Sequence, residues 1–275
     1  MLKWRRRGSA PTPDAQPQQA PAVDTPDLGL RDAALRGWFC HDTGALFRGF
    51  TVGPRDVVLD AGCGTGGNAA FCAGLGARVI LADIDPECLL MSRTRLAGCA
   101  TQPVEAMVTN CDPIPLSEAI ATRIICTEVL EHVADPTRVM AELVRIGRPG
   151  ALYLLTVPDP GSEQLQRRLA PDIYWQRPNH LRVFERDAFT SLVEGAGLRI
   201  EDRSCYGFYQ TIWWTMFWSC KVSLDAPTHP ALQHWAQSWE ALLGTPEGIA
   251  AKQALDDVLP KSQLILARKG ISASA

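Results

Sequence analysis

The chain has 275 residues, of which 46% are hydrophobic and 21% are charged, and its formal net charge is -3. This composition is typical of a globular protein with one sizeable core and, at most, a small appended lobe. The charge balance gives no reason to expect a nucleic-acid partner, because surfaces that bind polyanions are basic.

The nine cysteines argue against a disulfide framework or a zinc site. Their number is odd, no two form a C-x-x-C pair, and several fall within apolar, strand-like runs. We therefore expect reduced thiols in the core of a cytoplasmic protein.

Residues 1–26 predict a disordered tail. The basic run Lys3-Trp4-Arg5-Arg6-Arg7 is followed by a segment rich in Pro, Gln and Ala, which cannot bury enough surface to order itself. No apolar segment follows the basic run, so a signal peptide is not expected. The run could touch an anionic membrane surface, but a solvated tail is the simpler interpretation.

The segment 27–49 is predicted to be helical. Its apolar residues can share one broad face, which is interrupted near Gly37 and Gly44. We expect this helix to pack against the edge of a sheet and to cover part of a ligand cleft.

A strand, a glycine-rich turn and a helix follow. Residues 57–59 are a short apolar run of the kind found in a strand buried on both faces, and the run ends at Asp60. Four glycines crowd into the next six positions after Ala61, namely Gly62, Gly64, Gly66 and Gly67. A helix is expected from Asn68 onward, which completes the opening of a nucleotide-binding βαβ unit.

The glycines alone leave the nucleotide open. Gly62-x-Gly64-x-x-Gly67 satisfies the dinucleotide fingerprint, which would suit an NAD-dependent oxidoreductase. Asp60 favours another ligand, because a carboxylate facing the loop would repel a pyrophosphate and attract an ammonium group. S-adenosylmethionine has an ammonium group and no phosphate.

Strands and helices then alternate. Further strands are predicted at 76–83, 104–109, 123–127 and 151–157. This alternation predicts a parallel, doubly wound sheet, in which ligands bind beyond the carboxyl ends of the strands. Acidic residues lie at or just past those ends: Asp60, Asp83, Asp112 and Glu128.

The last third of the chain has a different character. We predict helical material at 161–175, a helix at 186–194, a strand at 198–205, helices within 230–259 and a final strand at 262–268. Between them, Tyr206 to Val222 is dense in aromatic residues, yet it is too short and too often interrupted by polar residues to span a membrane. An aromatic helix face there suits a membrane interface or a pocket for a lipid-like or aromatic acceptor, but equally a lid core or a dimer contact.

These patterns divide the chain into three parts. The tail is 1–26, a cofactor-binding domain comprises 27–205 and 260–270, and an aromatic-rich helical insertion comprises 206–259. The insertion could serve as a lid or as an acceptor-binding lobe.

With these residues in place, the chain resembles the class I S-adenosylmethionine-dependent methyltransferases. It is most similar to their ubiquinone- and menaquinone-biosynthesis branch (methyltransferase type 11). The motifs that carry the resemblance are the glycine loop after Asp60, the segment Glu128-Val129-Leu130-Glu131-His132-Val133, and Asn179-His180-Leu181-Arg182-Val183-Phe184. The resemblance implies a Rossmann-like sheet of seven strands with the last strand antiparallel.

The resemblance also implies roles around the glycine loop. The backbone of Gly62, Gly64 and Gly66 would line the methionine moiety, and Asp60 would act on the ammonium, directly or through water. Cys63 would be a small filler in the loop, without a redox role.

Further implied roles concern the nucleoside. Asp83 would bind the ribose hydroxyls, and Ile84 would contact the adenine face. Asp112 would accept a hydrogen bond from the adenine amine, with Cys111 beside it.

The reacting end of the site is implied to lie after the fourth strand of the domain. Glu128 and Val129 would form the floor under the sulfonium. Methyl transfer to a hydroxyl benefits from a base, for which His132 and His180 are the candidates and Tyr174 a weaker one. Either histidine could instead be a hydrogen-bonded structural residue. The histidines and acids are too scattered along the chain to argue for a metal site.

The sequence thus predicts an S-adenosylmethionine-dependent methyltransferase that acts on a small or lipid-linked acceptor, at oxygen rather than at nitrogen or carbon. An RNA or protein acceptor is the alternative within enzymes. The alternatives from other classes are an NAD-dependent oxidoreductase and a cofactor-binding scaffold without catalysis. The expected location is the cytoplasm, with peripheral contact at the inner face of the membrane through the aromatic insertion as an option.

Overall fold

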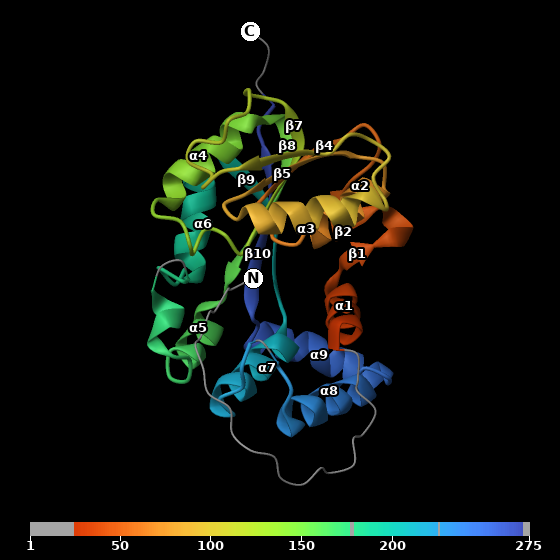
Figure 1. The fold of residues 1–275 in the computed structure, drawn as a ribbon, viewed down its shortest axis with the longest axis vertical. Coiled ribbons are helices and arrows are strands. Elements are labelled where there is room, and N and C mark those ends of the chain that lie inside the picture. Colours follow the sequence, from red (N-terminus) through yellow and green to blue (C-terminus); the bar gives the residue numbers. More distant parts are fainter. Residues whose placement is uncertain (1–24, 177–178, 225, 272–275) are drawn as a thin grey trace.

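A seven-stranded sheet forms the centre of the protein, whose computed structural model describes residues 25–176, 179–224 and 226–271 (Figure 1). Its strands lie in the order β6-β5-β4-β7-β8-β10-β9, and β10 runs antiparallel to both of its neighbours. The predicted sheet of seven strands with the last antiparallel is therefore confirmed. The strand bounds are β4 Val57–Ala61, β5 Arg78–Asp83, β6 Glu105–Val108, β7 Ala121–Thr127, β8 Gly147–Pro158, β9 Leu198–Tyr206 and β10 Ser262–Lys269.

Two layers of helices cover the sheet because its strands are apolar on both faces. One face packs against α4 (Pro136–Ile146) and α6 (Arg186–Gly195). The other face packs against α2 (Gly67–Gly74) and α3 (Pro86–Ala97). The strand order reverses between β4 and β7, so a crevice is expected beyond the carboxyl ends of these two strands.

The prediction of one helix over 27–49 is wrong. Helix α1 (Thr25–Arg36) ends before Gly37, and a small antiparallel sheet follows, formed by β1 (Trp38–Cys40), β2 (Ala45–Phe47) and β3 (Phe50–Thr51), with the short helix η1 (His41–Thr43) between the first two strands. Gly37, Gly44 and Gly49 all have positive φ, at 109°, 63° and 88°. Glycines at these angles end the helix and allow tight turns between short aromatic strands.

Three helices lie between β9 and β10 and form a separate layer in Figure 1: α7 (Phe208–Ser219), α8 (Pro230–Leu242) and α9 (Pro246–Val258). The N-terminal helix α1 packs on this layer through Leu28, and its Arg36 also donates a hydrogen bond at 2.7 Å to the Cys205 carbonyl of the edge strand β9. None of the described helices is long and apolar enough to cross a membrane.

A buried charge cluster joins α1 to this layer. Lys252 of α9 is fully buried and forms an ion pair with Asp256 and a longer one, at 3.6 Å, with Asp32 of α1. The Trp239 indole donates a hydrogen bond to Asp32 at 2.8 Å. Asp256 in turn accepts hydrogen bonds from the Gly207 and Phe208 amides at the start of α7. One lysine thus links α1, α7, α8 and α9.

The segment between β8 and α6 contains α5 (Pro160–Gln166) and the short helix η2 (Asp172–Trp175). The helical material predicted at 161–175 is therefore two short pieces. Asp159 fixes the start of α5, because its carboxylate accepts a hydrogen bond from the Gly161 amide and pairs with Arg186 of α6 at 2.8 Å.

Candidate functional site

The loop between β4 and α2 is held in a conformation that favours glycine. Gly62, Gly64 and Gly66 have φ of 72°, 51° and 77°. The Gly62 and Cys63 amides both donate to the carbonyl of Ala82, the residue before Asp83 at the end of β5. A side chain at Gly62 would meet Val129, because an added Cβ would lie 2.2 Å from Val129 Cγ2. The loop therefore exposes its backbone closely at the carboxyl ends of β4 and β5, as a cofactor cradle requires.

Gly62→Ala is expected to destabilise the protein by about 2–4 kcal/mol, from overpacking and from a side chain at positive φ. The variant should also bind S-adenosylmethionine with lower affinity, because the added side chain distorts the loop. Urea unfolding and calorimetry measure the two effects. Adding Val129→Ala should recover part of the stability by removing the clash. Gly74→Ala is a matched control, since nothing lies within 4 Å of its added Cβ. Equal stability of Gly62→Ala and the wild type would contradict the cradle.

Asp60, at the end of β4, is 1% exposed. Within the described parts of the chain, neither of its carboxylate oxygens has a hydrogen-bond partner, and the nearby Ala69 amide falls short of hydrogen-bond geometry. Burial, and next the negative charge of Asp83, raise the pKa of Asp60 to about 7. A buried carboxylate without partners is unusual, and a cationic ligand group would satisfy it.

Asp83 and Ile84 lie together at the end of β5. The Asp83 carboxylate accepts hydrogen bonds from the Gly64 amide at 2.8 Å and the Asp85 amide at 2.9 Å, so it organises the glycine loop. Ile84 is 70% exposed, which is unusual for a large apolar side chain and consistent with a surface for a planar group. Their roles toward a ribose and an adenine stay predictions.

Cys111 and Asp112 have surroundings that the sequence did not predict. The Cys111 side chain is buried in the core cluster on the α4 and α6 face of the sheet, so it is not offered to a ligand. Asp112 forms an ion pair with Arg138 of α4 at 3.0 Å. A contact with an adenine amine would therefore use a carboxylate that is already paired.

Cys63 is also buried in the core, and burial raises the pKa of its thiol to about 12. The thiol is therefore protonated at neutral pH, which fits the predicted role as a filler.

Glu128 follows β7 and adopts a positive φ of 57°. Its carboxylate pairs with Lys261, just before β10, and accepts a hydrogen bond from Thr156 of β8 at 2.9 Å. Burial would raise the pKa of Glu128, but the Lys261 charge together with hydrogen bonds from Lys261, Thr156 and Ser262 outweighs this effect and lowers the pKa. A charged pair thus lies beside the floor predicted from Glu128 and Val129. No motif pointed to Lys261, because it is distant in sequence.

Two histidines that are 48 positions apart meet beyond the end of β7. The rings of His132 and His180 lie 4.9 Å apart, centre to centre, nearly at right angles. Glu131 completes the cluster, with a carboxylate oxygen 3.6 Å from His132 Nε2. Glu131 is 1% exposed, and its carboxylate has no hydrogen-bond partner among the described residues. Burial and the charge of Glu128 raise the pKa of Glu131 well above its usual range.

Backbone and arginine contacts explain why the histidines meet. The Leu181 amide donates to the Glu131 carbonyl at 2.9 Å. Arg182 donates to the carbonyls of Leu130 and Ala134 at 3.3 and 2.9 Å. Asn179, which is 4% exposed, donates to the Ile173 carbonyl and holds η2 beside the cluster. The predicted motif at 179–184 therefore connects the loop after β7 with the short helix η2.

The same cluster could hold a cation. One ligand atom each from Glu131, His132 and His180 lies within 4.8 Å of the others, and a carboxylate with two imidazoles is a common donor set for transition metals. The sequence argument that these groups are too scattered for a metal site is thus wrong about their positions.

A second layer of groups lies behind His180. The Glu163 carboxylate of α5 is 2.8 Å from His180 Nδ1, and Tyr174 donates to Glu163 at 3.4 Å. The Tyr174 ring packs on His180, at 4.5 Å between centres, and touches Trp218 of α7, at 5.8 Å. The aromatic helix α7 therefore borders the cluster. Glu163 was missed from the sequence, where nothing distinguishes it from a surface acid.

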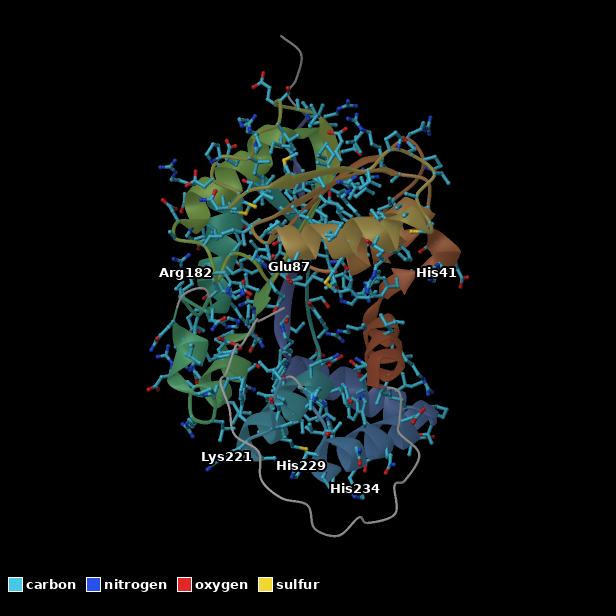
Figure 2. The ribbon with its side chains drawn as sticks, in the orientation of Figure 1. His41, Glu87, Arg182, Lys221, His229 and His234 are labelled. Atoms are coloured by element: carbon cyan, nitrogen blue, oxygen red, sulfur yellow. The ribbon has the colours of Figure 1, made fainter. Side chains whose placement is uncertain are left out.

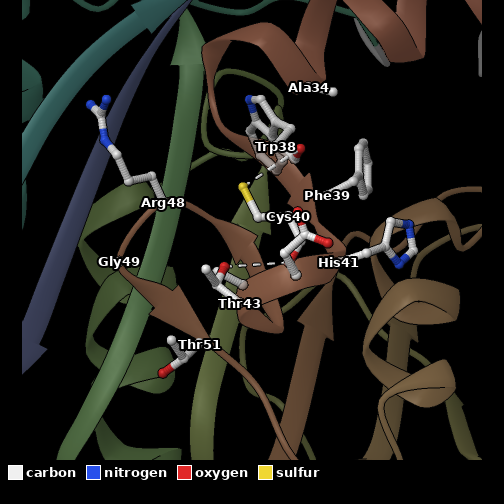
Figure 3. A pocket seen from close by; sticks show the side chains of 11 residues that line it. Ala34, Trp38, Phe39, Cys40, His41, Thr43, Arg48, Gly49 and Thr51 are labelled. Atoms are coloured by element: carbon white, nitrogen blue, oxygen red, sulfur yellow. Dashed lines mark hydrogen bonds between the residues drawn. The ribbon is translucent and has the colours of Figure 1, made fainter.

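The other three of the five histidines lie on peripheral elements: His41 on η1, His229 at the start of α8 and His234 on α8 (Figure 2). A cavity of about 760 Å³ lies over α1 and the small sheet, lined by residues that include Trp38, Phe39 and Arg48 (Figure 3). Its lining includes none of the strand-end acids, so we do not assign it to the site.

Comparisons with known proteins agree with this geometry. The family model described as a methyltransferase domain matches residues 39–202. A probable S-adenosylmethionine-dependent methyltransferase of Mycolicibacterium smegmatis is 30% identical over 54% of this chain and 53% of its own length. A ubiquinone biosynthesis O-methyltransferase of Xanthomonas axonopodis is 30% identical over 54% of this chain and 64% of its own length. The chain thus spans about half to two thirds of these relatives.

Solved structures give the same fold. The putative methyltransferase in a complex with the Haloferax volcanii methyltransferase activator Trm112 has a TM-score of 0.56 at 18% identity. The match covers 90% of this chain and 95% of that chain. A putative methyltransferase of Bacillus halodurans has a TM-score of 0.53 at 17% identity, over 80% and 94%. These identities support the fold alone, whereas the family model covers more than half of the sequence. The chain belongs to the S-adenosylmethionine-dependent methyltransferase family.

Proposed function

We propose that this protein transfers a methyl group to a hydroxyl oxygen of a small or lipid-linked acceptor, with His180 or His132 as the base. The observation that carries the proposal is the His132–His180–Glu131 cluster, in which Glu131 and His132 follow Glu128 and Val129 just beyond β7, at the switch point of the sheet. The name of the Xanthomonas relative, an O-methyltransferase, supports an oxygen acceptor.

The chain's own groups would divide the work. The glycine loop and Asp60 would hold the amino acid end of the cofactor, and Asp83 and Ile84 its nucleoside end. When bound, the cofactor supplies a methyl carbon on a sulfonium that leaves with the electron pair of the broken C–S bond. A histidine nitrogen would take the hydroxyl proton as the new C–O bond forms, and burial of the cluster would exclude water.

The aromatic helix α7 supports an aromatic or lipid-like acceptor. Trp218 touches Tyr174, which itself packs on His180, so a planar or apolar group could bind against this wall. Trp213, Trp214 and Trp218 are each half-buried, so they could also contact a membrane surface that holds a lipid-linked acceptor.

The purified protein with labelled S-adenosylmethionine and a cell extract tests the proposal. We expect label in the small-molecule or lipid fraction, as a methoxy group identified by NMR. Label in RNA or protein would favour the alternative acceptors, and absence of label in every fraction would favour a scaffold.

The histidine variants test the site itself. His180→Ala and His132→Ala should leave affinity for S-adenosylmethionine nearly unchanged and lower turnover by about 100-fold or more where the residue is the base. His234→Ala, on a peripheral helix, is the control. A chelator separates two mechanisms, since loss of activity that added divalent cation restores would make the cluster a metal site. Full turnover of both variants would remove them from catalysis.

A further inference from the structure

We propose that Glu163 is a positioning residue that holds His180 in its Nδ1–H tautomer, which leaves the lone pair on Nε2. The use of that lone pair to accept a hydroxyl proton rests on the proposed function, whereas the tautomer itself does not.

The geometry around Glu163 supports this assignment. The carboxylate is 3% exposed and lies 2.8 Å from His180 Nδ1. A carboxylate only accepts hydrogen bonds, so the proton between the two groups must belong to the imidazole. The neutral ring then has no proton on Nε2, and that nitrogen is the one available as a base.

The surroundings keep Glu163 in place. It lies in the first turn of α5, whose start is fixed by Asp159 through the Gly161 amide and Arg186. The Tyr174 hydroxyl donates to its second oxygen, and the Tyr174 ring packs on His180. In the described parts of the chain, the Glu163 carboxylate has hydrogen-bond contacts with the side chains of Tyr174 and His180. A buried acid with so few partners is costly to stability unless it serves a specific neighbour.

The arrangement matches the general logic of a base oriented by a third group. A buried carboxylate on the far nitrogen fixes both the ring orientation and the tautomer, and it stabilises the imidazolium that forms when the near nitrogen takes a proton. The same contact would orient His180 if it held a metal ion. Glu163 is thus assigned to His180 and not to the acceptor.

NMR of the ¹⁵N-labelled full chain tests the proposal directly. At a pH at which imidazoles are neutral, long-range ¹H–¹⁵N spectra distinguish the two tautomers, and the His180 signals are assigned by their loss in His180→Ala. We expect the Nδ1–H tautomer in the wild type. The Nε2–H tautomer there would overturn the proposal without any variant.

Glu163→Leu provides the second test, because leucine has no acceptor for Nδ1–H and so removes the hydrogen bond that fixes the tautomer. We expect the Nε2–H tautomer in this variant, together with a fall in kcat of about 100-fold or more and little change in affinity for S-adenosylmethionine. Glu194→Leu, at an exposed acid on α6, is the control. An unchanged Nδ1–H tautomer in Glu163→Leu would contradict the positioning role. A changed tautomer with an unchanged kcat would mean that Glu163 orients His180 without contributing to catalysis. A wild type that transfers no methyl group contradicts the proposed function, while the tautomer still decides the role of Glu163.

Discussion

Asp60→Asn is expected to stabilise the ligand-free protein while weakening its binding of S-adenosylmethionine. Asp60 is 1% exposed, and the pKa of its carboxyl is raised from the ordinary 3.8 to about 7. In the unfolded chain the carboxyl ionises near pH 3.8, whereas the folded protein retains the proton up to about pH 7. Ionised Asp60 therefore opposes folding, by an amount that grows between these two values and is complete above pH 7.

The magnitude follows from the shift of about three pKa units, which corresponds to up to about 4 kcal/mol at pH 8. Asparagine does not ionise and escapes this destabilisation. Urea unfolding of the ligand-free proteins should show a higher free energy of unfolding for Asp60→Asn than for the wild type. This difference should be smaller at pH 5 than at pH 8. Asp42→Asn, at an exposed position, is the control and should change little. A variant less stable than the wild type at pH 8 would contradict the raised pKa.

The same substitution should reduce affinity for S-adenosylmethionine by about 1–3 kcal/mol, the range for a hydrogen bond to a charged group. In the wild type, affinity should rise as the pH increases through about 7, because the ammonium of the ligand pairs with the ionised carboxylate. Calorimetry across this pH range measures both effects. In Asp60→Asn the rise should be lost, and an unchanged pH profile would remove Asp60 from the ligand's contacts.

Lys252→Met is expected to destabilise the protein by about 3–5 kcal/mol, although methionine fills much the same volume. Lys252 is fully buried between Asp256 and Asp32. Removing its charge leaves two buried carboxylates without their cation. Because Asp256 also caps the start of α7, the loss should loosen the helical layer as a whole.

Chemical denaturation measures this effect, and hydrogen exchange should show reduced protection in α7, α8 and α9 before the sheet. Lys221→Met, at an exposed position after α7, is the matched control and should change stability by no more than about 0.5 kcal/mol. Adding Asp32→Asn to Lys252→Met should recover part of the loss, because one unpaired charge is removed. An unchanged free energy of unfolding in Lys252→Met would mean that the cluster contributes nothing to the layer.

Local patterns were enough to predict the sheet and the cofactor loop. The apolar run before Asp60 and the glycines after it specify a strand, a turn and a helix through short-range sterics, so their structure depends little on the rest of the chain. The alternation of strands and helices likewise predicted the order of layers, and the acids at the strand ends followed from it. The helix predicted over 27–49 failed because three glycines with positive φ outweighed an apolar spacing that short strands can share.

The sequence by itself determined the strand, the glycine loop and the helix around Asp60, and it predicted that this βαβ unit, with Asp83, binds the cofactor. Only the tertiary structure decided what surrounds the reacting end. His132, Glu163, His180 and Lys261 are separated by tens of residues, and they converge because β7, β8 and β10 are neighbours in the sheet. Separate tertiary contacts pair Asp112 with Arg138 of α4 and place the Cys111 side chain in the core. No local pattern encodes such contacts, because they depend on strand order and on how the loops pack beyond it.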